Sequence, residues 1–197
     1  LDSSEFEGTR LANLNGKVYG WPWILGTRVL FINKDVVEKG GYPRDFIPIR
    51  WPELMESAVR ISKAGAGQFY GWGSNAPEKH RLYKKYMPFF WSNDAQIFTD
   101  DGKYCVLSSQ KAIEALHFYR ELNDVGYVAD QRGVEDAWLE GKVAFVISGD
   151  WLIKRIEIEK RAIDFTTTFI PGPKYPGKSF MGGEFLSINA SSTHKDE

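Results

Sequence analysis

An unbroken run of apolar residues near the middle of the chain gives the clearest structural prediction. Val143 to Ile147 consists of strand-favouring residues, and its length is typical of a β-strand that is buried on both faces. Ser148-Gly149-Asp150 then predicts a tight turn, and Trp151 to Ile156 predicts a helix. This order places Asp150 and Trp151 at the carboxyl edge of a sheet, where open α/β folds bind their ligands.

Hydrophobic periodicity predicts two further long helices. In Arg50 to Lys63 the apolar residues Leu54, Ala58 and Ile61 fall on one face. The longest helix begins at Ser108 or Ser109 and runs to about Val125, with Ser as a candidate N-cap. Its predicted apolar stripe is Ile113, Leu116, Tyr119 and Leu122.

Shorter patterns fill the rest of the chain. Asn15-Gly16 predicts a turn, and Asp101-Gly102 predicts the turn of a hairpin over residues 97–106. Pro88 is expected to kink or break its helix. The remaining predicted strands are 17–25, 28–32, 68–73, 165–170 and 180–188, and the remaining helices are 34–39, 82–91 and 134–140. Because helices and strands alternate, the pattern predicts an α/β lobe with a sheet flanked by helices.

Composition excludes several classes of protein. The chain of 197 residues carries 25 basic and 26 acidic residues, so it has no basic field for nucleic acid. Cys105 has no second cysteine, which excludes an internal disulfide. No apolar run is long enough to cross a bilayer. Leu1 to Glu5 is polar and unlike a signal peptide, and we expect that the chain has lost its natural start.

Motifs for metal or nucleotide chemistry are weak. His80, His117 and His194 are scattered, so no metal or cofactor is predicted. Residues 172–179 match the spacing of a phosphate-binding P-loop, but two prolines remove backbone donors and no helix is predicted to follow. A surface loop is the better interpretation. Paired carboxylates for glycoside cleavage remain open, since Asp150 and Glu184 both lie at predicted strand ends.

The tryptophans divide into two groups. Trp51, Trp91 and Trp138 lie on predicted helices, and core packing is favoured for them. Four others flank turns at strand ends, where the sequence leaves both stacking on a ligand and core packing open: Trp21, Trp23, Trp72 and Trp151. Arg28 follows a glycine turn and is either a donor to ligand oxygens or a solvated surface arginine. Asn75 opens a polar loop, 74–79.

Several segments together resemble a known family. They are Asn15-Gly-Lys-Val-Tyr-Gly-Trp-Pro22, Thr27-Arg-Val-Leu-Phe-Ile-Asn-Lys-Asp35, Trp51-Pro-Glu-Leu54, Trp91-Ser-Asn-Asp-Ala-Gln-Ile-Phe98, Glu140 to Trp151 and Gly182 to Ser192. Their order and spacing resemble the bacterial ABC-transporter extracellular solute-binding proteins of the maltose-binding type (family 1). The resemblance covers nearly the whole chain.

The resemblance implies a periplasmic-binding-protein-like (type II) fold, in which two α/β lobes joined by crossing strands close around a sugar. Residues 1–26 would be the end of the first lobe and the first crossing, 27–179 the second lobe, and 180–197 the return crossing. The implied ligand-binding residues are Trp21, Trp23, Arg28, Trp72, Asn75, Asp150, Trp151, Gly183 and Glu184. Departures from the family pattern occur at Gly26, Arg50 and Asp94-Ala95.

The same resemblance implies a role without catalysis. The expected partners are a carbohydrate ligand and the transmembrane permease subunits of an ABC importer. We expect a monomer with no membrane span of its own, located in the periplasm or outside the cell and anchored there as a lipoprotein in a Gram-positive cell. A glycoside hydrolase that uses Asp150 and Glu184 is the alternative.

Overall fold

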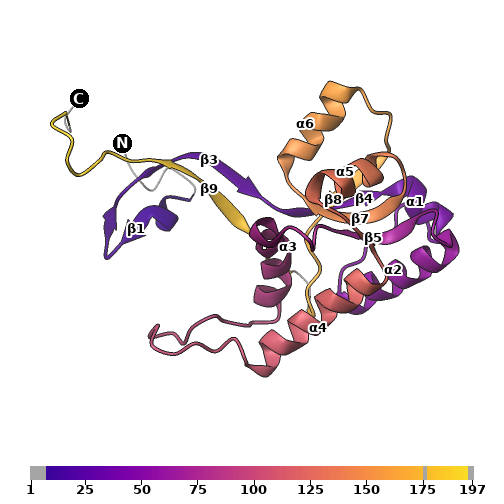
Figure 1. Cartoon of the computed structure of the whole chain (residues 1–197), viewed down its shortest axis with the longest axis horizontal. Helices are drawn as coiled ribbons and strands as arrows, with labels where there is room; N and C mark the ends of the chain where they lie inside the picture. The colour runs from indigo at the N-terminus through magenta and orange to yellow at the C-terminus, as the bar shows by residue number, and fades with distance from the viewer. Residues whose placement is uncertain (1–7, 175–176, 195–197) are drawn as a thin grey trace. The chain divides into compact units, whose positions relative to one another are not determined.

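The computed structural model of the chain describes residues 8–174 and 177–194 (Figure 1). These residues form two compact units. Of the described residues, the smaller unit contains 8–27 and 181–194, and the larger unit contains 28–174 and 177–180. The predicted α/β lobe corresponds to the larger unit, which contains a sheet covered by helices.

A five-stranded mixed sheet forms the centre of the larger unit, with strand order β6-β5-β7-β4-β8. β5 pairs in parallel with both β6 and β7, whereas β4 pairs antiparallel with β7 and β8. The carboxyl ends of β5, β6, β7 and β8 and the amino end of β4 therefore share one edge. The strands are β4 (Val29–Asn33), β5 (Tyr70–Ser74), β6 (Tyr127–Val128), β7 (Val143–Ser148) and β8 (Phe165–Thr168).

Helices cover both faces of this sheet. Leu30 and Ile32 of β4 join a core cluster with α1, α2, α3 and α4, while Phe31 joins one with α5 and α6. Figure 1 shows α5 and α6 on one side of the strands and α2 and α4 on the other. The helices are α1 (Lys34–Lys39), α2 (Trp51–Gly65), α3 (Lys79–Ser92), α4 (Gln110–Asp124), α5 (Gln131–Leu139) and α6 (Asp150–Glu159).

The predicted central strand is confirmed. All six residues of β7 are buried, as expected for a strand between two layers of helices. Leu54, Ala58 and Ile61 of α2 are also fully buried, which confirms the predicted apolar face of that helix.

The smaller unit is built from extended segments. A 3₁₀ helix (Thr9–Ala12, η2) precedes β1 (Asn13–Leu14) and β2 (Lys17–Val18), which are joined through Asn15-Gly16. Both turn residues have positive φ, as the Asn-Gly pair predicts. β3 (Trp21–Thr27) pairs antiparallel with β9 (Met181–Leu186), and the register shifts between Pro22 and Ile24, where proline cannot donate to the ladder.

The predicted apolar stripe of α4 is partly wrong. Tyr119 and Leu122 are buried, but Ile113 and Leu116 are 40% and 55% exposed. The buried residues of the preceding turns are instead Ala112 and Ala115, which pack in a cluster with Phe90 of α3. The small side chains of Ala112 and Ala115 let α4 approach α3 closely. The prediction placed the apolar stripe on the larger residues Ile113 and Leu116, and this is why it was wrong.

Two other local predictions are confirmed in part. Residues 97–106 reverse direction around Asp101-Gly102, with an antiparallel bridge between Phe98 and Cys105 and backbone hydrogen bonds from Thr99 to Tyr104 and from Val106 to Ile97, but the two arms do not extend into full strands. The break expected at Pro88 is wrong, because α3 continues to Ser92 with Pro88 buried inside it.

Replacing Phe31 with alanine tests the packing between the sheet and α5. The ring is fully buried and lies 5.7 Å, edge to face, from Trp138. We expect Phe31→Ala to lower the free energy of unfolding by about 3–5 kcal/mol, because a cavity remains. The matched control is Phe98→Ala, at a ring that is 55% exposed, with an expected change within about 0.5 kcal/mol. Equal losses in urea denaturation would contradict the assignment of the core.

Candidate functional site

The candidate site lies at the shared edge of the sheet in the larger unit. Asn75 follows β5, Gln131 begins α5 just after β6, and Asp150 begins α6 just after β7. Arg28 precedes β4, whose antiparallel direction brings its amino end to the same edge. The topology therefore gathers polar side chains from four separate segments.

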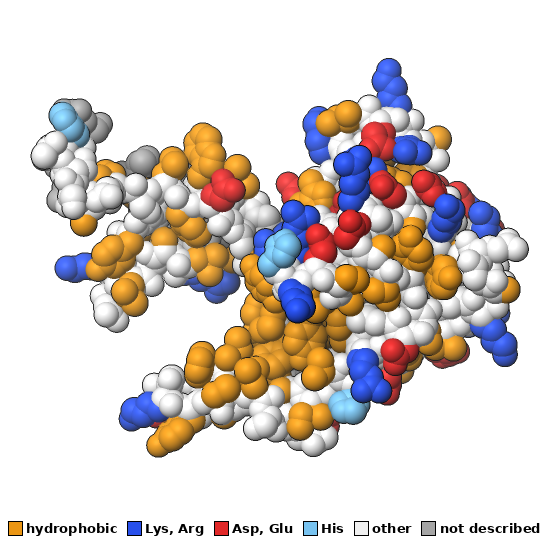
Figure 2. Space-filling view, viewed as in Figure 1, with side chains coloured by type: hydrophobic (Ala, Val, Ile, Leu, Met, Phe, Trp, Pro, Cys, Tyr) orange, Lys and Arg blue, Asp and Glu red, His pale blue; other side chains and the backbone are white. Residues whose placement is uncertain are grey.

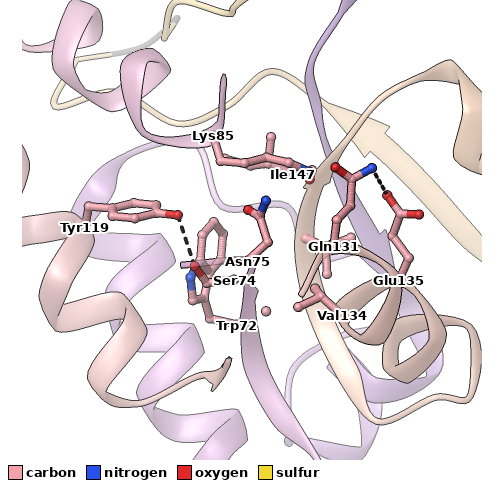
Figure 3. A pocket seen from close by; sticks show the side chains of 11 residues that line it. Trp72, Ser74, Asn75, Lys85, Tyr119, Gln131, Val134, Glu135 and Ile147 are labelled. Atoms are coloured by element: carbon pink, nitrogen blue, oxygen red, sulfur yellow. Dashed lines mark hydrogen bonds between the residues drawn. The ribbon is translucent and has the colours of Figure 1, made fainter. Parts of the chain in front are cut away.

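A buried carboxylate, Glu135 of α5, organises this edge. Glu135 is only 6% exposed. One oxygen, Oε1, accepts hydrogen bonds from Ser148 Oγ (2.9 Å), Trp151 Nε1 (2.8 Å) and Gln131 Nε2 (3.2 Å). Figure 3 shows the bond from Gln131. Burial of a charge is tolerated only with such partners, so Glu135 fixes the positions of the groups that donate to it.

Lys85 of α3 brings a buried cation to the same place. The residue is 7% exposed, and its Nζ donates to the backbone carbonyl of Ile147. The pKa of Lys85 is lowered to about 8, mainly because burial disfavours the charged form; Arg28 acts in the same direction, and Glu135 and Glu78 oppose the shift. Lys85 therefore still carries its proton at neutral pH, and its charge offsets that of Glu135.

Trp151 is held in one orientation by contacts on several sides. Its Nε1 donates to Glu135, and the guanidinium carbon of Arg28 lies over the indole, 4.4 Å from the ring centroid. A Cβ on Gly149 would lie 2.0 Å from Cζ3 of the same ring. Gly149 has an ordinary φ of −123°, so glycine is needed there for space, to let the indole lie against the backbone.

Arg28 is not a solvated surface arginine, which was one of its two sequence interpretations. The residue is only 9% exposed, and its backbone N–H donates to the carbonyl of Phe180. Burial lowers the pKa of its guanidinium, and Asp150, Tyr83 and Glu135 act in the opposite direction. Its guanidinium also lies 5.6 Å from the ring centroid of Phe180, so it connects two aromatic side chains.

An aromatic surface continues from Phe180. Its ring stacks on Trp91 with centroids 6.2 Å apart, and it meets Tyr83 edge-on at 5.6 Å. Figure 2 shows hydrophobic side chains gathered over α3 and the loop that follows it. Tyr83 is 46% exposed, so the surface next to Arg28 offers aromatic area as well as charge.

Asn75 lies at the edge, but Trp72 does not offer a stacking face. Asn75 is buried and its Nδ2 donates to Glu78, which also accepts from the backbone N–H of Gln131 (2.8 Å). Trp72 is 1% exposed and packs in the core against Phe89. The cavity beside it holds about 10 Å³, roughly one water molecule, so its prediction as a ligand-stacking residue needs correction (Figure 3).

The other predicted site residues belong to the smaller unit. Trp23 is 66% exposed and lies at the irregularity of β3, while Trp21 is half-buried. On β9, Gly183 has no room for a Cβ, which would lie 2.3 Å from the carbonyl oxygen of Ile24. Glu184 is exposed and pairs with Ile24. The larger unit therefore holds Arg28, Asn75, Asp150 and Trp151. The smaller unit holds Trp21, Trp23, Gly183 and Glu184.

Sequence reasoning missed Glu135, Lys85 and Gln131. A signal for the first was present, since Glu135 lies next to Val134 and three residues before Trp138 on the buried face of α5. Lys85 likewise lies four residues before Phe89 on the buried face of α3. A charged residue within an apolar helix stripe indicates either a partnered core charge or a site.

Other kinds of site find no support in the described part of the chain. Residues 8–174 and 177–194 contain no group of three or more His, Cys, Asp or Glu that could hold a metal ion. Their helices include none with the length and apolarity of a membrane span. Residues 175 and 176 of the P-loop-like stretch lie outside the described residues, and the element after that stretch is strand β9.

Comparison with known proteins identifies the family. The family model of the bacterial extracellular solute-binding proteins matches residues 1–197. A binding protein of Brucella abortus (strain 2308) is 32% identical over 192 residues, which cover 93% of this chain and 45% of the relative. The chain therefore belongs to the bacterial extracellular solute-binding proteins. It spans about half the length of the curated relatives it matches.

Further relatives agree with this assignment. The lactose-binding protein of Rhizobium radiobacter is 23% identical over 195 residues, covering 95% of this chain and 45% of that protein. A solved solute-binding protein of Thermotoga lettingae TMO, bound with α-D-tagatose, is 27% identical with a TM-score of 0.79, covering 98% of this chain and 53% of that one. The predicted type II periplasmic-binding-protein fold is confirmed by this likeness.

A Gly149→Ala substitution tests the packing of Trp151. The added methyl group would overlap the indole ring, so we expect the ring to rotate away and to lose its bond to Glu135. In a ¹H–¹⁵N spectrum, the indole N–H signal of Trp151, assigned with Trp151→Phe, would shift and exchange faster with solvent. An unchanged indole signal in Gly149→Ala would show that the ring is not held against this glycine.

The burial of Lys85 predicts a pH dependence of stability. Its pKa is about 8 in the folded chain against 10.5 when exposed, so between these values the unfolded chain binds more protons and stability rises with pH. From pH 7 to 9.5 the wild type should gain about 2 kcal/mol in the free energy of unfolding relative to Lys85→Met. The comparison cancels the titration of other groups. A parallel pH dependence of both proteins in urea denaturation would refute the shifted pKa.

Proposed function

We propose that the chain is part of the carbohydrate-binding component of an ABC importer. It binds a sugar or oligosaccharide in a cleft between two lobes and delivers it to a membrane permease. The observation that carries the proposal is the fixed indole of Trp151 at the carboxyl edge of the sheet, beside Arg28 and Asp150. Aromatic faces cover the apolar C–H surface of sugars, while charged and amide groups bond the hydroxyls.

The named ligands of relatives support this ligand class. One relative is a lactose-binding protein, and the Thermotoga lettingae protein holds α-D-tagatose. Both are solute-binding proteins rather than enzymes, which favours binding without catalysis for this chain as well. The glycoside hydrolase alternative would require turnover that depends on Asp150 and Glu184.

Each unit has a separate role in this proposal. The larger unit, close to the predicted second lobe of residues 27–179, contributes Trp151 as the aromatic platform and Asp150, Arg28 and Asn75 as hydroxyl partners. Residues 1–26 and 180–197 would form the crossing segments, which contribute Trp21, Trp23, Gly183 and Glu184. Arg28 already covers part of the Trp151 ring, so a sugar would stack on the remaining area.

Closure of the lobes would make the loaded state recognisable to the permease. We infer a monomer that acts in the periplasm or outside the cell, carried on a lipid anchor in a Gram-positive organism. Membership in the extracellular solute-binding family supports this location.

Calorimetry with a panel of mono- and oligosaccharides tests the proposal, using the protein at its full natural length. Trp151→Ala is expected to weaken binding of the best sugar by about five- to thirtyfold, since an aromatic contact in a binding site contributes on the order of 1–2 kcal/mol. Asp150→Asn should also weaken it. The matched control is Asp124→Asn, at an exposed carboxylate on the last turn of α4 that pairs only loosely with Arg120.

Two outcomes would reject the proposal. One is the absence of heat with every sugar, combined with tight binding of a peptide or a metal ion. The other is hydrolysis of an aryl glycoside that disappears in both Asp150→Asn and Glu184→Gln, which would establish the enzymatic alternative.

A further inference from the structure

A cavity of about 230 Å³ at the candidate site is lined by four cationic side chains. They are Arg28, Arg81, Lys84 and Lys85, and the other lining residues are Gln131 and Trp151. No carboxylate is among these lining residues. All six belong to the larger unit, so the cavity does not depend on the smaller one.

The charge of this cavity differs from that of other surface hollows in the described chain. A hollow between α5 and α6 is lined by three arginines and three carboxylates, in which Arg155, for example, pairs with Asp136 and Glu159. Another is lined by three lysines, Lys111, Lys174 and Lys178, with one carboxylate, Asp94, to which Lys111 and Lys178 are paired. Carboxylates are part of the lining of both hollows, whereas the lining of the basic cavity has cations and no carboxylate.

The carboxylates near the basic cavity are engaged with other groups. Glu135 accepts three hydrogen bonds through one oxygen and is buried behind the lining. Glu78 accepts from Asn75 and from the backbone of Gln131, and its other oxygen lies 3.5 Å from Arg81. Asp150 acts on Arg28 at longer range. Within residues 8–174 and 177–194, no ion pair is formed by Lys84.

The first turns of α3 also concentrate positive charge at this cavity. Lys79, Arg81, Lys84 and Lys85 lie in the first two turns of this helix, and its first turn contains no acidic residue. The N-cap residue of the helix is Glu78, which pairs with Arg81, so the helix end itself already faces a carboxylate. A bound anion would therefore meet the positive charge of the side chains that line the cavity rather than the helix end.

We propose that the ligand of this chain is an acidic carbohydrate, whose carboxylate or phosphate group enters the basic cavity while its sugar ring contacts Trp151. This rests on the proposed function and specifies its substrate class. The cavity volume of about 230 Å³ is many times that of the one-water cavity beside Trp72, which leaves room for a sugar ring with its anionic group. Arginine provides forked donors for a planar carboxylate or phosphate, and lysine provides point charge.

Calorimetry on the protein at its full natural length tests the inference with three matched ligands: a neutral hexose or oligosaccharide, the corresponding uronate and the corresponding sugar phosphate. We expect one of the two anionic ligands to bind at least about 100-fold more tightly than the neutral ligand, with an affinity that falls as salt rises. Whichever anionic ligand binds more tightly identifies the anionic group as carboxylate or phosphate.

Substitutions in the cavity lining test whether this cavity causes the preference for an anionic ligand. Arg81→Gln and Lys84→Gln change exposed or half-exposed side chains, and their combination should weaken the anionic ligand at least about tenfold without lowering the melting temperature. Lys111→Gln and Lys174→Gln, which line a different hollow, should leave the affinity unchanged.

The outcomes separate this inference from the proposed function. If neutral sugars bind as tightly as their anionic counterparts, the acidic-ligand inference is wrong while carbohydrate binding stands. If inorganic phosphate binds but no carbohydrate of either charge does, both are wrong. An anionic preference that survives in the Arg81→Gln, Lys84→Gln double variant would also overturn the assignment to this cavity.

Discussion

The buried carboxylate of Glu135 is the constraint on which the candidate site depends. A charge with so little exposure must be hydrogen-bonded and partly neutralised, or its burial would cost several kcal/mol. The structure meets this requirement with donors from β7, α5 and α6 and with the ammonium group of Lys85 from α3. One carboxylate thereby ties four elements to a common geometry, and the orientation of Trp151 follows from it.

The mixed sheet explains why the remaining groups gather at the same place. β4 runs antiparallel to β7, so the chain enters the larger unit at the edge where β5, β6 and β7 end. It also leaves there, because the backbone of Arg28 is bonded to Phe180, the last residue of the unit. This is a consequence of topology rather than of any one residue.

The sequence was sufficient to predict the elements that have strong local patterns. It was insufficient to predict the burial and the partners of side chains, which depend on packing between elements. The run Val143 to Ile147 predicted a buried strand, and its turn predicted Asp150 and Trp151 at the edge, because strand period and turn chemistry act locally. For Trp72 the sequence could not distinguish core packing from ligand stacking, because its burial depends on the helices that cover it. Glu135 and Lys85 were missed because their partners lie on other elements, and no spacing along one helix reveals a partner on another.

The network around Glu135 serves orientation more than stability. Buried charges commonly contribute no more to stability than apolar residues of the same shape, so stability alone gives little reason to keep Glu135 and Lys85 where they are. Their measurable effect is on the indole of Trp151, which is bonded at its nitrogen, packed on Gly149 and faced by Arg28. If Trp151 is the sugar platform of the proposed function, a ring held in this way would lose little conformational entropy when the ligand arrives, and preorganisation of this kind adds to affinity without adding contacts. The structural cost of the buried charge and the fixed orientation of the ring are therefore two consequences of the same hydrogen bonds.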